Sequence, residues 1–271
     1  MNKSIGLFCF LLAMFFSAKT QVSPYVLLKT MEQKSVLMEV DILGNVYLSD
    51  GSVLYMYDKN FQLKYTYSDF FSGSMSTIDV SNPMKIWVFS QDFMLLTVLN
   101  NQLVKQNNTY RFSDWNIMLP KTICASYDNG FWVYDAMKDA LFRFDAFGKK
   151  IIESQSLHIL VDKKIMVDGM REIGGKYLIV NSEKYGLFVF DKFGTYIKYI
   201  PTEGVKNFSV WNSKIVYVLN GKVEVFDIET LDKQTYPLPQ PDTQKVVIHK
   251  QHLISLSTSG EVKVYGIADL E

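Results

Sequence analysis

Three carboxylate side chains stand inside short strand-like runs of the chain, at Glu39, Asp79 and Asp168. Carboxylate oxygens are hard ligands of the kind that calcium prefers in proteins. Such side chains could hold a divalent cation if the fold brought them together. The alternative is structural, because carboxylates also end strands and hydrogen-bond water, and this alternative is the one we favour.

The other motifs that would identify an enzyme are missing. The three histidines, His158, His249 and His252, show neither H-x-x-x-H nor H-E-x-x-H spacing, so a zinc site is not indicated. The sequence contains no G-x-S-x-G nucleophile elbow, and no G-x-G-x-x-G follows a strand into a helix. We therefore predict a non-enzymatic protein without a cofactor.

Large apolar side chains occur in segments that read as loops, where polar turn residues are usual. Aromatic residues and methionine are enriched in the cores of protein interfaces, so these side chains predict a surface that binds a protein partner. The alternative is that each side chain covers the core beneath its own loop. The candidates are Phe93, Trp115, Met118, Met137 and Tyr185.

The loops and strands follow an internal repeat. Residues 141–148 and 187–194 share the pattern Leu-Phe-x-Phe-Asp-x-Phe-Gly, 46 residues apart. Weaker copies end at Asp58, Asp227 and Gly266, and a degenerate copy ends at Asn100. Six copies of one strand at such a period indicate a repeat architecture that runs through a single domain.

Each repeat contains four predicted strands, which in the third copy are 122–128, 131–135, 141–145 and 149–156. Many strands are apolar at consecutive positions, as expected for a sheet that is buried on both faces. The D-x-x-G segments that end at Gly148 and Gly194 predict tight turns with a left-handed glycine. Asn60 is expected to take the same left-handed position in the first copy.

The chain is predicted to be exported. Lys3, an apolar run from Ile5 to Phe16 and small residues before position 21 are typical of a secretory signal, so residues 1–20 are assigned to a signal peptide. Residues 21–271 form the predicted domain, and no transmembrane span is expected. Cys124 is then the only cysteine left, and we expect a buried, inert thiol. The formal net charge of +0 makes nucleic acid an improbable partner.

From about Gln21 to Gly266 the chain resembles the six-bladed β-propellers of the broad NHL-repeat and TolB-like group. The resemblance implies an all-β domain of six four-stranded blades. The last copy lacks a fourth strand and the N-terminus has one to spare at 25–29, so that strand is expected to close the ring. The resemblance also implies that the first strands of the repeats line a central channel. There, Glu39, Asp79 and Asp168 would form a metal site like that of propeller lactonases.

These features together favour an exported, monomeric, non-enzymatic propeller of a bacterial periplasm or cell surface. Its expected role is to bind a protein partner in the cell envelope, such as an outer-membrane channel or assembly. Two alternatives stay open. One is a metal-dependent, lactonase-like hydrolase at the channel mouth, and the other is a carbohydrate-binding propeller whose loop aromatics stack on sugars.

Overall fold

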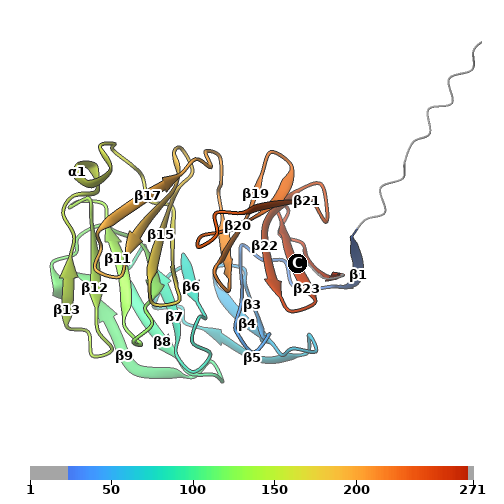
Figure 1. Cartoon of the computed structure of the whole chain (residues 1–271). Coiled ribbons are helices and arrows are strands. Elements are labelled where there is room, and N and C mark those ends of the chain that lie inside the picture. Colours follow the sequence, from blue (N-terminus) through green and yellow to red (C-terminus); the bar gives the residue numbers. More distant parts are fainter. Residues whose placement is uncertain (1–23, 268–271) are drawn as a thin grey trace, which may run out of the picture.

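The computed structural model describes residues 24–267, apart from the side chains of residues 107 and 108. Within that range the chain forms six four-stranded antiparallel sheets, arranged as blades around an axis (Figure 1). The predicted fold, a six-bladed β-propeller, is confirmed. The predicted signal peptide, residues 1–20, lies outside the described residues.

In blades 1 to 5 the four strands of each sheet follow one another in the chain, from the axis outwards. Blades 1 and 2 contain β2 (Leu37–Val40), β3 (Val46–Ser49), β4 (Val53–Tyr57), β5 (Leu63–Ser68), β6 (Thr77–Asp79), β7 (Ile86–Ser90), β8 (Leu95–Leu99) and β9 (Lys105–Arg111). Blades 3 and 4 contain β10 (Pro120–Ala125), β11 (Phe131–Asp135), β12 (Ala140–Phe144), β13 (Lys150–Glu153), β14 (Gly169–Ile173), β15 (Tyr177–Ser182), β16 (Gly186–Asp191) and β17 (Tyr196–Ile200). Blade 5 contains β18 (Phe208–Trp211), β19 (Lys214–Leu219), β20 (Lys222–Asp227) and β21 (Lys233–Pro237).

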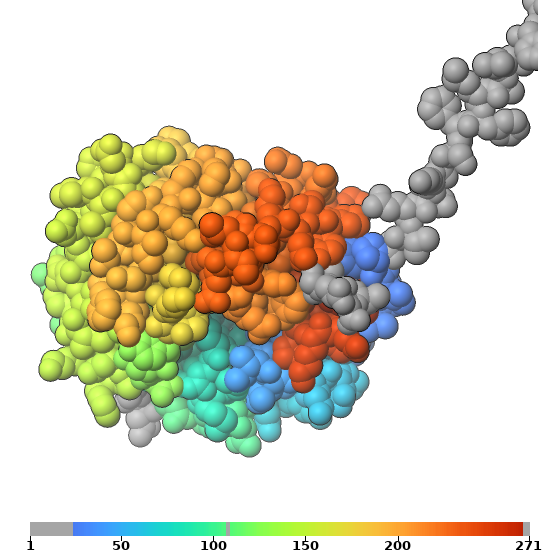
Figure 2. All heavy atoms as spheres, in the orientation of Figure 1, coloured from blue at the N-terminus to red at the C-terminus, as the bar shows by residue number. Residues whose placement is uncertain are grey.

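Blade 6 is assembled from both ends of the described chain. It consists of β22 (Thr243–His249), β23 (His252–Ser257), β24 (Val262–Ile267) and, as its outer strand, β1 (Tyr25–Thr30). β1 runs antiparallel to β24, with Tyr25 opposite Ile267, and Figure 2 shows the blue first strand beside the red last ones. The expectation that the N-terminal strand closes the ring is therefore confirmed.

β1 also contacts both blades that flank blade 6. The Tyr25 hydroxyl donates a hydrogen bond of 2.8 Å to the carbonyl of Pro237 in blade 5. The Lys29 ammonium donates one of 2.7 Å to the carbonyl of Phe61 in blade 1. One short strand thus connects three consecutive blades.

The core lies between the blades. The middle strands β7, β8, β11 and β12 are buried along their whole length, whereas most residues of the outer strands β5 and β13 are exposed. The buried apolar residues form six clusters, each shared by two neighbouring blades of the described chain. The fully buried Cys124 belongs to the cluster between blades 3 and 4, and this burial raises the pKa of its thiol.

The predicted turn chemistry is present between the third and fourth strands of blades 3 and 4. In blade 3, the Asp145 Oδ1 atom accepts hydrogen bonds of 2.9 Å from the amides of Phe147 and Lys149. Gly148 has φ 81° and Gly194 has φ 80°, so both glycines take the left-handed conformation that was expected.

The expectation for Asn60 is wrong, because the left-handed residue of that turn is Phe61, with φ 59°. The Asp58 side chain accepts hydrogen bonds from the amides two and four residues ahead, as Asp145 does. The same pattern places Leu103 in the left-handed region, with φ 58°. The side-chain acceptor at the first position fixes the backbone of the turn. The fourth residue therefore takes the left-handed conformation whatever its type, even where the third residue is an asparagine, which tolerates that conformation better.

Two short helical segments were not expected from the sequence. They are α1 (Leu157–Val161), in the connection between blades 3 and 4, and the 3₁₀ helix η1 (Phe112–Trp115), between blades 2 and 3. Both are shorter than two turns, which is too short for a helical period to register in the sequence. No helix among residues 24–267 has the length and apolar character needed to cross a membrane.

Deleting residues 24–30 should remove the outer strand of blade 6 and expose the edge of β24. We expect a large fall in the unfolding temperature together with self-association, because an unpaired edge strand recruits other chains. Thermal unfolding and size-exclusion chromatography measure both effects. Lys29→Ala, which breaks only the contact with blade 1, is the control and should leave a monomer; a deletion variant as stable as the parent would show that the ring closes otherwise.

The two turn glycines should differ in their response to substitution. A β-carbon on Gly148 would lie 3.1 Å from both Trp115 and Tyr110, whereas the nearest atom to one on Gly194 is 3.6 Å away, in Ile152. Gly194→Ala should cost about 1 kcal/mol of unfolding free energy from backbone strain alone, and Gly148→Ala about 2 kcal/mol. Urea unfolding decides between them, and equal losses would contradict the crowding at Gly148.

Candidate functional site

A groove of about 1020 Å³ crosses one face of the ring over blades 3 and 4. Four connections contribute to it: the turn between β11 and β12, the long segment between β13 and β14 that contains α1, the turn between β15 and β16, and, through Gly204, the segment between β17 and β18. We call it the blade 3–4 groove. Its lining residues are Lys121, Tyr134, Ala136, Met137, Asp139, His158, Lys164, Ile165, Met166, Asp168, Ser182, Glu183, Lys184, Tyr185 and Gly204.

Asp139 joins two of these connections. It takes the left-handed conformation, with φ 52°, at the start of β12. Its carboxylate accepts hydrogen bonds from the Tyr134 hydroxyl at 2.8 Å, the Ser156 hydroxyl at 2.7 Å and the His158 amide at 2.8 Å. The buried side chain of Leu157 packs below into the core. The wall formed by α1 is therefore fixed to the blade beneath it.

The carboxylate of Asp135 brings two of the predicted binding residues together. Asp135 is fully buried, and it accepts hydrogen bonds from the amides of Met137 at 3.0 Å, Leu119 at 3.1 Å and Met118 at 3.3 Å. The backbones of residues 118 and 137 therefore meet at one buried group. Their side chains are 48% and 66% exposed, so apolar surface continues beyond the groove itself.

Tyr185 of blade 4 lines the same groove as Met137 of blade 3. Its ring is half-buried and packs on the core cluster of blades 3 and 4, and its carbonyl accepts a hydrogen bond from the Tyr199 hydroxyl. The ammonium groups of Lys163 and Lys184 lie over the ring, at 5.6 Å and 5.0 Å from its centre. Tyr185 is thus a fixed aromatic surface between cations.

Only Met137 and Tyr185 of the five predicted binding residues line the groove, and Trp115 and Phe93 lie away from it. The Trp115 ring lies 4.3 Å from the centre of Phe144 and 5.3 Å from that of Tyr110, so it covers the core between blades 2 and 3. Phe93 is 55% exposed, and its ring lies against Gly73 in the connection between blades 1 and 2. Met118 lies beside the groove rather than in its lining, because its amide shares the Asp135 carboxylate with that of Met137.

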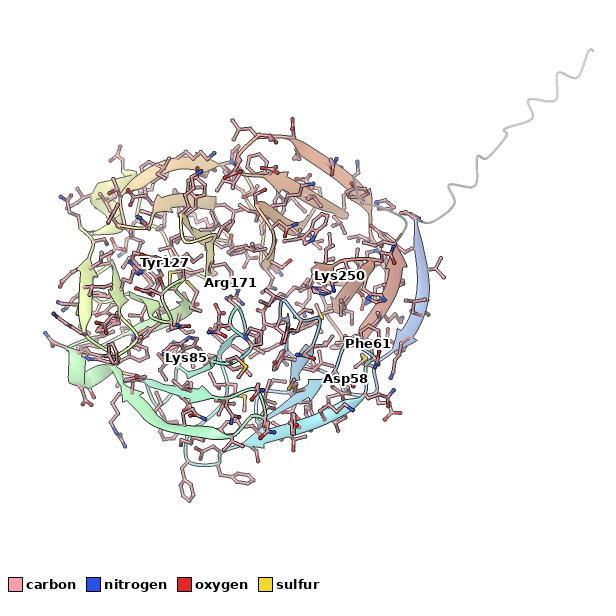
Figure 3. The ribbon with its side chains drawn as sticks, turned by 60° about the horizontal axis from the view of Figure 1, so that its bottom comes forward. Asp58, Phe61, Lys85, Tyr127, Arg171 and Lys250 are labelled. Atoms are coloured by element: carbon pink, nitrogen blue, oxygen red, sulfur yellow. The ribbon has the colours of Figure 1, made fainter. Side chains whose placement is uncertain are left out.

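A buried charge cluster occupies the central channel. Glu39 of blade 1 accepts hydrogen bonds from Arg171 of blade 4 and from Lys245 of blade 6, the latter at 2.6 Å. In Figure 3, Arg171 lies near the centre of the ring. Burial opposes the charge of both cations, and it lowers the pKa of Lys245 because Glu39 offsets only part of the effect. The pKa of Arg171 is raised nevertheless, because Glu39 and Asp79 outweigh its burial.

The three candidate metal ligands are engaged with the protein. Glu39 is shared by two cations, as described, and the buried Asp79 accepts hydrogen bonds of 2.9 Å from the amides of Ser81 and Ala125. Asp168, at the border between channel and groove, accepts one of 2.7 Å from the Glu183 amide. Among the described residues, no three His, Cys, Asp or Glu side chains converge as a cation would require. The metal-dependent alternative stays a prediction.

Sequence reasoning missed part of the groove. Ile165 and Met166 line it from the segment before β14, and Met166 is 67% exposed. A short apolar run of this kind reads as a strand, so its place beside a turn of another blade could not be recognised. Ser182 was also missed; its buried hydroxyl lines the groove and forms no hydrogen bond within the described chain.

Comparison with known proteins identifies the fold only. No family model matches the chain, and no curated protein matches it either. Solved structures of similar fold include streptogramin B lyase, with 12% identity, TM-score 0.61 and coverage of 90% of this chain and 88% of that one. The WD40 domain of Pan2 from Neurospora crassa has 9% identity, TM-score 0.59 and coverages of 88% and 90%. BBS1N in complex with ARL6DN has 15% identity, TM-score 0.58 and coverages of 87% and 78%.

Replacing Glu39 by glutamine should destabilise the fold by about 3 kcal/mol, because two buried cations would lose their shared counter-charge. Lys245→Met should cost less, since Arg171 remains on Glu39. Glu153→Gln is the matched control, because its ion pair with Lys150 is exposed and should contribute below about 0.5 kcal/mol. Denaturant unfolding measures all three, and a Glu39→Gln variant with the parental midpoint would contradict the role of the cluster.

Proposed function

We propose that this chain is an exported, non-enzymatic β-propeller that binds a protein partner through the blade 3–4 groove. One observation carries the proposal: the exposed side chains of Met137 and Met166, which come from separate connections, line one groove of about 1020 Å³ together with the half-buried Tyr185. Met118 and Leu119, whose amides share the Asp135 carboxylate with that of Met137, are also more than 40% exposed beside the groove.

The composition of the groove suits the recognition of a polypeptide. Methionine side chains are flexible and polarisable, so Met137 and Met166 can adapt to the shape of a partner. Tyr185 is held by its packing and hydrogen bonding, which makes it a rigid anchor of low entropic cost. Exposed apolar surface that is gathered in one place, rather than scattered, is typical of an interaction site.

The two aspartates of the groove support a structural role rather than acid–base chemistry. The carboxylate of Asp139 accepts three hydrogen bonds from the protein, and that of Asp168 accepts one from a backbone amide. Both therefore hold the connections in place. An acid or base would need a side chain that is available to a substrate proton.

The proposed cellular setting rests on the signal-like segment at residues 1–20, which supports export to the periplasm or the cell surface. There the mature chain is proposed to be a monomer on its own. A partner in the bacterial envelope, such as an outer-membrane channel or assembly, is the proposed ligand of the groove. The similarity to BBS1N, whose structure contains ARL6DN, supports the use of this fold as a binding module.

A photo-crosslinking amino acid at position 137 should capture the partner in intact cells. The same amino acid at position 147 is the matched control, because Phe147 is 92% exposed at the opposite end of β12. We expect one discrete adduct from position 137 and none from position 147.

Met137→Asp combined with Met166→Asp should weaken partner binding about tenfold or more, with an unchanged melting temperature. Full binding by this variant, or an adduct from position 147 alone, would contradict the proposal.

A further inference from the structure

A second cavity, of about 150 Å³, lies where blade 6 meets blade 1. It is formed by the turn that joins β2 to β3, the turn that joins β4 to β5, and the turn that joins β22 to β23. These turns emerge on the face opposite the blade 3–4 groove. We call it the seam cavity, because it sits beside the ring closure; Figure 3 labels two of its lining residues, Phe61 and Lys250, on one side of the ring.

The charged side chains that line the seam cavity are all basic. They are Lys59 from blade 1 and His249, Lys250 and His252 from blade 6, and no Asp or Glu lines it. Neither lysine forms an ion pair within the part of the chain that the structure describes. The cavity therefore concentrates positive charge without a counter-charge of its own.

The nearest carboxylates are committed elsewhere. Asp41 is 2% exposed, and its two oxygens accept hydrogen bonds from the amides of Leu43 and Asn45, the side chain of Asn45 and the hydroxyl of Tyr47. Asp58 accepts two backbone amides of its own turn and pairs with Lys64 at 3.1 Å. Both carboxylates are held by their own turns and neither lines the cavity, although the charge of Asp41 still acts on His249.

Basic side chains from different blades begin close to Gly44. A β-carbon at this position, where φ is 89°, would lie 3.1 Å from Nε2 of His249 and 3.6 Å from Cβ of Lys59. The His252 ring lies edge-on to Phe61, with 5.4 Å between the ring centres, so its orientation is fixed by packing. The absence of a side chain at Gly44 thus allows the groups of blades 1 and 6 to converge.

We propose that the seam cavity binds a tetrahedral oxyanion, a phosphate or sulfate group, through Lys59, Lys250 and the two histidines. Lysine ammonium groups bind such anions as point charges, and imidazolium adds N–H donors. The volume corresponds to about five water molecules at about 30 Å³ each, which accommodates four oxygens around one central atom. A bound anion would join blade 6 to blade 1 and so stabilise the closed ring.

Binding should strengthen as the pH falls. Burial lowers the pKa of His249, and the charges of Lys250 and His252 lower it further, against the opposing effect of Asp41. Besides Lys250 and the two histidines, Lys59 is the other basic side chain that lines the cavity. A bound anion favours the protonated imidazole, so the site takes up protons on binding and its affinity rises below neutral pH. Sulfate is the suitable probe, because it keeps its charge over this range.

Calorimetric titration of the full chain with inorganic sulfate, in a chloride background of constant ionic strength, tests the proposal. We expect saturable binding that is tighter at pH 5.5 than at pH 8. Lys59→Gln and Lys250→Gln should each weaken it by about fivefold or more. Lys192→Gln is the matched control, because Lys192 follows Asp191 in the turn of blade 4 as Lys59 follows Asp58 in blade 1, and it should leave the affinity unchanged.

Absence of saturable binding would overturn the proposal, as would an equal loss in the Lys192→Gln variant or an affinity independent of pH. Inorganic phosphate and glycerol 3-phosphate then separate two sources of the ligand. Comparable affinities would support a phosphate group carried on a larger molecule, whereas binding of phosphate alone would support the free ion. The blade 3–4 groove is not involved, so this test and that of the partner site fail independently.

Discussion

The pairing of β1 with β24 is the constraint on which the structure depends. A blade whose middle strands are apolar on both faces cannot stay soluble alone, and its faces are covered only by its two neighbours. The six core clusters are therefore complete only when the ring is closed. Closure requires the N-terminal strand, which contacts blade 5 through Tyr25 and blade 1 through Lys29. Both proposed sites also lie between two blades, so their geometry depends on the same closure.

The fold could be predicted from the sequence because its determinants are local and repeated. A sequence motif such as residues 141–148 specifies a buried strand and the turn that follows it. Each copy of the motif predicts the same local structure. The missing fourth strand of the last copy then identified the closing strand. The prediction for the first turn failed because the preference of asparagine for the left-handed conformation was given more weight than the position of Phe61 in the turn. α1 was missed because a helix of so few residues shows no helical period in the sequence.

The candidate site could be predicted only in part, because residue type does not reveal the neighbours across the fold. Met137 and Tyr185 were recognised as loop residues of a type that anchors interfaces, and they line one groove. Trp115 is also a large aromatic residue of a type that anchors interfaces, yet its ring packs against Phe144 of blade 3. This contact depends on the path of η1, which the sequence does not reveal. For Glu39 the decisive partners are 132 and 206 residues away, at Arg171 and Lys245, a distance that no local pattern encodes.

The charge cluster of the channel has a consequence for cooperativity. In a repeat protein whose units contact only their neighbours, stability behaves as a sum of nearest-neighbour terms, and one end can unravel while the rest persists. Glu39 joins blade 1 to blade 4, which is not its neighbour, and also to blade 6. Loss of blade 1 would leave two buried cations without their shared counter-charge, and loss of blade 4 or blade 6 would remove one of the two cations that Glu39 binds. The ring is therefore expected to unfold as one unit, with no populated state in which some blades are folded and others are not.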